Sequence, residues 1–373
     1  MRLHILPDQK IINRTIETFE HVYPEDNKYV VLSSTGQFRY VDVQKKNVFP
    51  LTSVKSDEFW NVIGEVSDYS SIVIHYLTNN AVYFLNRIEH PHIYWIEWGY
   101  DLYNNLLEPR GFEMYTNIHE ISRFLYSSSL SRLLHRYCSF LYPRQKVKNA
   151  IKKVHYFVPD SMYDEYPLLL SYYPQFGHLE YRDFFYYPID QVIDASIRDE
   201  RCHGKNIVVG NSCSFTGNHL EIIRLLSSLG LNDRKVKFPI NYAGSTEYRN
   251  YIIKKGKELL GLQFEPLLDY KPLDDYNRYL LDSSYFIYNS YRQEAVGNIL
   301  VALYIGGKVY LSDKSPLLKF YKSLGLVLFP VSSLTKQSLN EPLSEDEINY
   351  NRTIIDNHYS LERLYSLVKQ NFL

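Results

Sequence analysis

The chain has 373 residues, enough for two domains of ordinary size, each with its own hydrophobic core. Its 41 Lys and Arg balance 42 Asp and Glu, and the net charge of -1 gives no overall field that would draw it to nucleic acid. Three widely spaced cysteines fit neither a disulfide framework nor a thiolate metal cage. We find no leader and no run of ~18 to 20 apolar residues, so we expect a cytoplasmic protein.

Short apolar runs alternate with helical patterns, which is typical of βα units in a parallel sheet. In the first half, strands are predicted at 2–6, 28–33, 71–76, 92–96 and 154–158. In the second half, strands are predicted at 206–210, 235–239, 285–289, 308–312 and 326–330. Helices are predicted near 217–229, 246–260, 273–282, 296–304 and 315–324. The sequence therefore predicts an α/β protein made of two α/β halves with parallel sheets.

The boundary between these domains is expected near residue 195, because 172–205 is rich in Tyr, Pro and charge and has no sustained period. We assign 1–195 to the amino-terminal domain and 196–350 to the carboxyl-terminal domain. Within the final segment, 351–373, residues 352–371 have the pattern of one helix, which we expect to pack back on the amino-terminal domain.

A small-residue loop follows the strand NIVVG in the second half. Gly210, Asn211 and Ser212 are expected to form a tight turn, and Gly217 and Asn218 precede an apolar-periodic helix. The amino terminus of such a helix carries unpaired N–H groups and partial positive charge, which suits a diphosphate. The loop has neither a dinucleotide fingerprint nor a P-loop, so an ordinary capped βα turn is the alternative.

A second polar loop follows the strand YFIYN. It carries Arg292 and Gln293 at the start of another helix, and Gly297 lies in its first turn. Ligands of parallel α/β sheets bind beyond the carboxyl ends of strands, and an arginine offers two parallel donors to phosphate. The alternative for Arg292 is a solvated or ion-paired side chain.

Several motifs in chain order resemble glycosyltransferase family 56. They are HILPDQKI, SIVIHYL and WGYDLY in the first half, and VGNS…NH, PINYAG…EY and RQ-x-A-x-GN followed by ALYIGGKVYL in the second. The family's enzyme transfers N-acetylfucosamine from a TDP-sugar to lipid II of the enterobacterial common antigen. This chain has Gly217-Asn218-His219 where the family has Asn-Asn-His, and Ala295-Val296-Gly297-Asn298 where it has Gly-x-Gly-Thr. The donor sugar therefore need not be N-acetylfucosamine.

The resemblance implies a GT-B architecture, two Rossmann-like domains facing across a cleft, with the nucleotide sugar on the carboxyl-terminal domain. It implies a TDP- or UDP-linked donor held by Gly210, Asn211, Ser212, Asn218, His219, Tyr242, Arg292, Gln293, Gly297 and Asn298. No Asp-x-Asp metal motif occurs, so we expect no cofactor and a metal-independent reaction. Arg292 would then stabilise the departing nucleoside diphosphate.

The amino-terminal domain would bind the acceptor. We predict Asp101 as the catalytic base and His75 as the second candidate, with Glu97 third. Asp8, Lys10, Trp98 and Tyr100 are predicted to contact the acceptor. A helix-capping role for Asp101 and a structural role for His75 are the alternatives, and inversion or retention of configuration stays open.

Residues 132–153 contain seven basic side chains and no acidic one: Arg132, Arg136, Arg144, Lys146, Lys148, Lys152 and Lys153. Aromatic and aliphatic residues lie between them. This pattern suits the anionic inner face of the plasma membrane, where a polyprenyl-diphosphate acceptor would be met. A solvated basic helix face is the alternative, and no motif supports nucleic-acid binding.

The leading hypothesis is therefore a bacterial glycosyltransferase that extends a lipid-linked or other surface glycan. Two alternatives remain: a nucleotide-sugar epimerase on the same scaffold, and a non-catalytic member that binds glycan.

Overall fold

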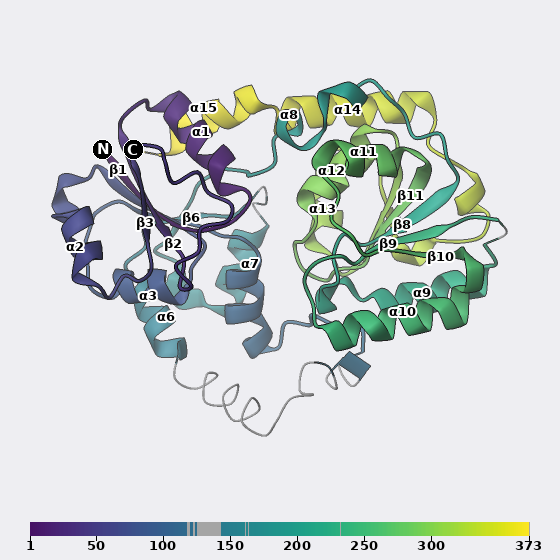
Figure 1. The fold of residues 1–373 in the computed structure, drawn as a ribbon, viewed down its shortest axis with the longest axis horizontal. Coiled ribbons are helices and arrows are strands. Elements are labelled where there is room, and N and C mark those ends of the chain that lie inside the picture. The colour runs from purple at the N-terminus through teal and green to yellow at the C-terminus, as the bar shows by residue number, and fades with distance from the viewer. Residues whose placement is uncertain are drawn as a thin grey trace. The chain divides into compact units, whose positions relative to one another are not determined.

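The computed structural model describes residues 1–117, 120–121, 124, 143–160, 162, 164–231 and 233–372. The chain divides into two compact α/β units. The first contains Met1–Phe112 and the described parts of 143–186 and 362–372; the second contains the described parts of 113–124 and Tyr187–Leu361. Figure 1 shows one sheet in each unit, with helices on both of its faces.

The first unit is built on a parallel sheet of seven strands in the order β3-β2-β1-β4-β5-β6-β7. The strands are β1 Arg2–Pro7, β2 Asn27–Leu32, β3 Val48–Leu51, β4 Ser71–His75, β5 Ile93–Ile96, β6 Tyr156–Val158 and β7 Glu180–Tyr181. Ile5 of the central β1 pairs with Val30 on one side and Ile74 on the other. Helices cover both faces of such a sheet, which is why nearly all residues of its inner strands are buried.

Within its described residues, the first unit has six α-helices: α1 Ile12–Val22, α2 Asp57–Ile63, α3 Asn79–Leu85, α6 Pro143–Ile151, α7 Glu165–Tyr172 and α15 Leu361–Asn371. A π-helix, η2 Tyr100–Leu107, follows β5, and short 3-10 turns occur at η1 Val66–Asp68, η3 Glu108–Arg110 and η4 Pro174–Phe176. Ser56 and Thr78 cap α2 and α3 by accepting hydrogen bonds from backbone N–H groups of the first turn.

The second unit contains a parallel sheet of six strands in the order β10-β9-β8-β11-β12-β13. The strands are β8 Asn206–Val209, β9 Val236–Pro239, β10 Phe264–Leu267, β11 Ser283–Tyr288, β12 Lys308–Leu311 and β13 Phe329–Pro330. β11 is buried along its whole length. The two central strands, β8 and β11, pair directly, with Phe286 opposite Val208.

The described part of the second unit has seven α-helices: α8 Ile189–Val192, α9 His219–Leu229, α10 Thr246–Leu260, α11 Leu273–Leu281, α12 Val296–Tyr304, α13 Pro316–Ser323 and α14 Glu345–Tyr359. Short 3-10 turns occur at η5 Ala195–Ile197, η6 Phe215–Gly217, η7 Gly261–Gln263, η8 Val331–Ser333 and η9 Ser338–Asn340. In Figure 1, α9 and α10 lie side by side on one face of the sheet, and α12 lies on the other.

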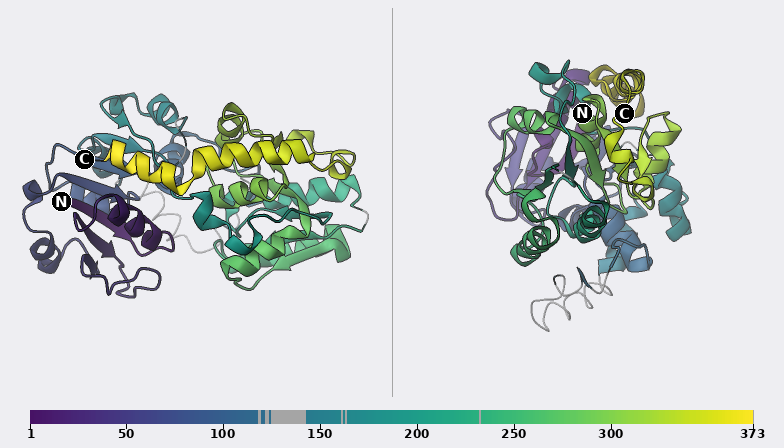
Figure 2. Two further views of the ribbon diagram at one scale, coloured as in Figure 1. Left: turned by 90° about the horizontal axis from the view of Figure 1, so that it is seen from above. Right: turned by 90° about the vertical axis from the view of Figure 1, so that its right-hand side faces the viewer.

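The two parallel-sheet α/β units confirm the predicted fold class. Three strands were missed, β3, β7 and β10, and each is at the edge of its sheet. The prediction of one helix over 352–371 was wrong. The chain forms α14 and α15 with a break at Ser360, whose backbone is extended (Figure 2).

The last helix, α15, packs in the first unit, and the segment around Glu120 packs in the second. In the first unit, His21 stacks on Tyr365 of α15, and the Tyr23 hydroxyl donates to the carbonyl of Phe372 at 2.8 Å. In the second unit, Glu120 accepts hydrogen bonds from Arg224 of α9 and Tyr251 of α10. Among the described helices, none is long and apolar enough to cross a membrane.

Candidate functional site

The second sheet has a topological switch point between β8 and β11. From β8 the chain proceeds outward to β9 and β10, and from β11 it proceeds in the other direction to β12 and β13. The loops that follow β8 and β11 therefore start side by side and then diverge, and ligands of parallel sheets bind at such points. Gly210 donates its N–H to the carbonyl of Ile287 at 2.9 Å, which joins the ends of the two strands.

The loop after β8 contains three of the residues predicted to bind the nucleotide sugar. Gly210 has a φ of +67°, which turns the chain at the strand end. The amide of Asn211 donates to the Tyr242 hydroxyl at 3.1 Å, and Ser212 is buried while its hydroxyl accepts from the N–H of Ser214. The Tyr242 ring is 50% exposed, so this side chain and Asn211 are accessible to a ligand.

The segment after β9 packs tightly against the same loop. The N–H of Cys213 donates to the carbonyl of Tyr242 at 2.8 Å. Ala243 and Gly244 both have positive φ, and a Cβ at Gly244 would lie 2.1 Å from the carbonyl oxygen of Cys213. Glycine is therefore required at this position by both its backbone conformation and its surroundings.

Asn218 and His219 are buried and have structural partners. Asn218 is in the left-handed region, its amide donates to the carbonyl of Asn289 at 3.0 Å, and its Oδ1 accepts from the N–H of Thr116. His219 lies near the Tyr248 hydroxyl, 3.4 Å away, and burial lowers its pKa to about 4. It is therefore uncharged near neutral pH. A Cβ at Gly217 would lie 2.6 Å from the His219 ring, which explains the glycine there.

The loop after β11 places Arg292 next to a carboxylate. The Arg292 Nε lies 3.5 Å from Oε2 of Glu294, and the two side chains are 11% and 14% exposed. The same oxygen accepts from the hydroxyls of Thr216, at 2.5 Å, and Ser290, at 3.0 Å. Gln293 is 5% exposed. Arg292 is thus ion-paired, which was the alternative considered from the sequence. Its partner, Glu294, was not singled out in the sequence analysis.

The helix after this loop, α12, begins at Val296, preceded by Ala295 with a φ of +66°. Gly297 faces the protein interior, because a Cβ there would lie 3.1 Å from the Tyr187 ring and 3.6 Å from Val192. Its small size allows α12 to pack closely, so the approach of a ligand is not needed to explain it. Asn298 is half-buried in the first turn.

The first sheet has its own switch point, between β1 and β4. Asp8 follows β1, and its two oxygens accept from the backbone N–H groups of Arg39, Tyr40 and Val41 at 2.7–3.1 Å. Lys10 is exposed, with its Nζ 5.9 Å from the centre of the Tyr40 ring. Asp8 therefore organises the loop that carries Tyr40.

His75, at the end of β4, lies in a buried chain of hydrogen bonds. Its Nδ1 is 2.8 Å from the Tyr186 hydroxyl, its Nε2 is 3.0 Å from Nδ1 of His4, and His4 continues to Asn27 Oδ1. The Asn27 amide nitrogen donates to the carbonyl of Tyr23, which leaves Oδ1 to accept from His4. His75 then donates to His4 and accepts from Tyr186. Burial lowers the pKa of His75 well below its usual value, and this geometry favours a structural role.

Asp101 is 1% exposed at the start of η2, and both of its oxygens are occupied. Oδ2 accepts from the N–H of Leu77 and from the Trp95 indole, each at 2.8 Å, and Oδ1 accepts from the N–H of Trp98 at 2.9 Å. Burial raises its pKa, and these hydrogen bonds oppose the rise. A carboxylate with three N–H donors around it favours the alternative structural role, in which it joins the loops after β4 and β5.

Aromatic rings gather at the ends of β4 and β5. Trp98 stacks on Tyr76, with ring centres 5.5 Å apart, and meets the edge of Tyr186 at 5.5 Å. Tyr100 is 50% exposed and lies against Tyr76. The structure thus brings together Trp98 and Tyr100, the two aromatic residues predicted to contact the acceptor. The sequence analysis did not single out Tyr76. Its φ of +69° could not be expected from the sequence, because tyrosine seldom adopts a positive φ.

Glu97 and Glu165 form a fully buried carboxyl pair in the same unit. Glu97 accepts from the N–H of Gly99. Burial raises the pKa of Glu97 well above its usual value, reinforced by the charges of Glu165 and Asp101, and burial raises the pKa of Glu165 to about 8. Near neutral pH the pair therefore retains protons that the unfolded chain has released.

This pair should make the stability of the first unit depend on pH. The folded state holds the Glu165 proton more tightly than the unfolded chain, so the free energy of unfolding falls as pH rises from about 4.5 towards about 8. The slope for one proton is at most ~1.4 kcal/mol per pH unit. Urea unfolding of Glu165→Gln should show a smaller slope and greater stability than the wild type at the upper end of this range. Glu17→Gln, at an exposed position of α1, should keep the wild-type slope.

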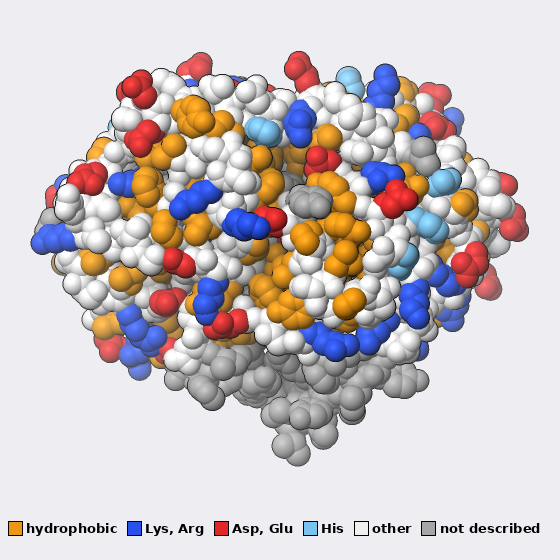
Figure 3. Space-filling model, turned by 180° about the vertical axis from the view of Figure 1, so that it is seen from behind, with side chains coloured by type: hydrophobic (Ala, Val, Ile, Leu, Met, Phe, Trp, Pro, Cys, Tyr) orange, Lys and Arg blue, Asp and Glu red, His pale blue; other side chains and the backbone are white. Residues whose placement is uncertain are grey.

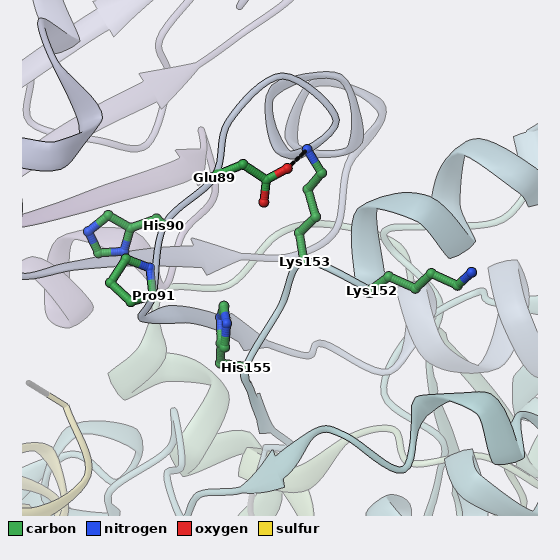
Figure 4. A pocket seen from close by; sticks show the side chains of 6 residues that line it. All are labelled: Glu89, His90, Pro91, Lys152, Lys153 and His155. Carbon is green, nitrogen blue, oxygen red and sulfur yellow. Dashed lines mark ion pairs between the residues drawn. The ribbon is translucent and has the colours of Figure 1, made fainter.

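The predicted basic segment is described in part. Arg132 and Arg136 lie outside the described residues, as does the side chain of Arg144. On α6 and just after it, Lys146 and Lys152 are exposed and Lys148 is half-buried. Lys153 pairs with Glu89 at 2.7 Å at the edge of a surface hollow that His90, Pro91, Lys152 and His155 also line (Figure 4). On the face shown in Figure 3, basic and acidic side chains are interspersed.

No group of three or more His, Cys, Asp or Glu side chains is arranged to hold a metal ion within the described part of the chain. The groups that can donate hydrogen bonds to a ligand at the switch point of the second sheet are Asn211, Tyr242, Arg292 and the amino terminus of α12. Amide, hydroxyl and guanidinium groups together suit an anionic ligand with polar substituents.

Solved structures of glycosyltransferases share this fold over nearly the whole chain. The sucrose-phosphate synthase of Thermosynechococcus elongatus is similar with a TM-score of 0.65 and 10% sequence identity, covering 99% of this chain and 98% of that one. A Rickettsia africae glycosyltransferase has a TM-score of 0.63 and 11% identity, with 98% and 95% covered. Anabaena HepE in complex with UDP-glucose has a TM-score of 0.61 and 10% identity, with 99% and 98% covered.

The chain therefore has the GT-B fold, with a parallel-sheet α/β unit in each half. At these identities the likeness concerns the fold alone. No protein-family model matches the sequence, so the resemblance to glycosyltransferase family 56 stays a hypothesis.

Proposed function

We propose that this protein is a glycosyltransferase. It would move a hexose, such as a deoxyamino hexose, from a nucleoside-diphosphate sugar to a lipid-linked or other surface glycan. The observation that carries the proposal is the switch point of the second sheet. There Arg292, Asn211, Tyr242 and the amino terminus of α12 follow strands that pair directly. Arg292 and the helix N–H groups would oppose the negative charge that grows on the diphosphate as the glycosidic bond breaks.

Two further facts support a nucleotide-sugar donor. Anabaena HepE, which shares the fold, has been solved with UDP and with UDP-glucose. The motifs around Gly210 and Arg292 resemble those of family 56, which implies a TDP- or UDP-linked donor. On this basis we assign donor binding to Gly210, Asn211, Ser212, Tyr242, Arg292, Gln293 and Asn298. Asn218, His219 and Gly297 would act indirectly, by shaping the loops and α12.

The acceptor is proposed to bind the first unit, where Trp98 and Tyr100 offer rings for stacking on sugar faces. A polyprenyl-diphosphate-linked glycan at the inner face of the plasma membrane fits the basic segment of residues 132–153 and the family resemblance. This would place the protein in the synthesis of a cell-envelope polysaccharide related to enterobacterial common antigen. Because Asp101 and His75 are engaged in buried hydrogen bonds, we propose that they position the acceptor loops.

The decisive experiment incubates the purified chain with a panel of UDP- and TDP-sugars, with and without a polyprenyl-diphosphate glycan. Sugar transfer that requires the lipid acceptor is the expected result. Conversion of a donor to its epimer without acceptor would favour the epimerase alternative. Glycan binding without turnover of any donor would favour a non-catalytic role.

Activity is expected to survive EDTA. The sequence has no Asp-x-Asp motif, and arginine with helix N–H groups can stabilise the departing diphosphate without a divalent ion. Initial rates measured before and after chelation should agree within about twofold. Complete loss of activity that Mg²⁺ or Mn²⁺ restores would contradict the prediction.

The described part of the basic segment should contribute to membrane binding. Replacing Lys146, Lys148 and Lys152 with Gln should weaken co-sedimentation with anionic vesicles, because each charge near such a surface contributes about 1 kcal/mol at most. Added salt should reproduce the effect. Lys153 is left unchanged because it pairs with Glu89. Binding that is indifferent to vesicle charge, salt and these substitutions would show that the segment is an ordinary solvated surface.

A further inference from the structure

Glu294 connects the two loops that the proposed diphosphate site requires. Its Oε2 accepts from Thr216, in the loop after β8, and from Ser290, in the loop after β11. The Ser214 hydroxyl lies 2.7 Å from that of Thr216 and extends the network. Arg292 lies beside the same carboxylate. One side chain thus bridges the two loops and lies beside the guanidinium.

The carboxylate also changes the charge that an anionic ligand would meet. Glu294 and Arg292 are both mostly buried, so solvent screens their fields weakly. An anion that reaches Arg292 is attracted by the guanidinium and repelled by Glu294. The repulsion grows with each further negative charge on the ligand.

Donor and product differ in that charge. The diphosphate of a nucleotide sugar is esterified at both ends and carries one negative charge per phosphate. After the sugar leaves, the terminal phosphate is linked only to the other phosphate, and its second ionisation has a pKa of about 6, so the product gains most of a further negative charge at neutral pH. A carboxylate at this position therefore disfavours the product more than the donor.

We propose that Glu294 is a positioning residue that holds Arg292 between the two loops and lowers the affinity for the nucleoside diphosphate relative to the nucleotide sugar, so that the product is released. This inference rests on the proposed function.

The test compares the affinities of UDP and UDP-glucose, and of TDP and TDP-glucose, for the wild type and Glu294→Gln by calorimetry. Glutamine retains an acceptor oxygen for Thr216 and Ser290 and removes the charge. The affinity for the diphosphates should rise about 10-fold, and the affinity for the sugar nucleotides should rise less, about threefold. An unchanged ratio of the two affinities would overturn the proposal.

Two variants separate charge from position. Thr216→Ala removes a hydrogen bond to Glu294 and keeps its charge, so both affinities should fall while their ratio stays the same. Glu258→Gln, at an exposed partner of Lys255, should alter neither. A change of the ratio in Thr216→Ala as large as in Glu294→Gln would show that loop position, and not charge, sets it.

A measurement on the wild type needs no variant. The methyl ester of UDP carries about one negative charge less than UDP at neutral pH and has no sugar. Glu294 offsets part of the attraction of Arg292 for this extra charge, so UDP should bind less than about 10-fold more tightly than the ester. Binding of UDP 10-fold tighter than the ester would overturn the inference and leave the proposed function intact. If neither diphosphates nor sugar nucleotides bind the wild type, the proposed function itself fails.

Discussion

Arg292→Ala is expected to abolish most of the activity. A charge-assisted hydrogen bond to the departing diphosphate is made in the transition state, and loss of such a donor lowers turnover by about 10² to 10³, or roughly 2.7 to 4 kcal/mol. Affinity for a nucleoside diphosphate should also fall at least about 10-fold, since Glu294 would remain without its cation and would repel the ligand. Calorimetry and initial-rate measurements would give the two effects separately.

The matched control is Arg224→Ala, on α9 of the same unit. Arg224 is 50% exposed and pairs with Glu120. Its removal should leave nucleotide affinity unchanged and cost little stability, as is usual for exposed pairs. Unchanged affinity and turnover in Arg292→Ala would refute the proposed diphosphate site.

Asp101→Asn is expected to destabilise the first unit by about 2–4 kcal/mol, because an amide can accept at one end only. Its NH₂ group would face an N–H of the surrounding chain, so at least one of the hydrogen bonds from Leu77, Trp95 and Trp98 would be lost. Urea unfolding followed by tryptophan fluorescence would measure the change. Asp68→Asn, at an exposed position of the same unit, should have little effect.

This experiment also decides the role that we predicted for Asp101 from the sequence. A catalytic base would lose turnover by roughly 10² to 10⁴ with stability and donor affinity preserved. A structural carboxylate would lose stability first, and turnover would fall with the fraction of folded protein. Near-normal stability with a hundredfold loss of turnover would therefore restore the base assignment.

The sequence by itself determined the α/β architecture. The central strands are continuous apolar runs such as IVV in β8 and IVI in β4, since helices cover both faces of a parallel sheet. The edge strands β3, β7 and β10 lack this signal. Two of them contain proline, Pro50 and Pro266, and the third has only two residues, because an edge strand is half solvated and pairs on one side. The loops after β8 and β11 were located correctly because the continuous apolar runs of these strands show where each strand ends.

The tertiary structure alone decided what each candidate side chain touches. The chain His4–His75–Tyr186 joins residues that are far apart in sequence, and Asp101 gathers donors from the segments after β4 and within β5. Glu294 lies two residues beyond Arg292, yet only the pairing of β8 with β11 brings Thr216 to it. A polar residue of a given type can either bind a ligand or hold the fold together. Which of the two it does depends on distances and burial that arise only when strands distant in sequence pair.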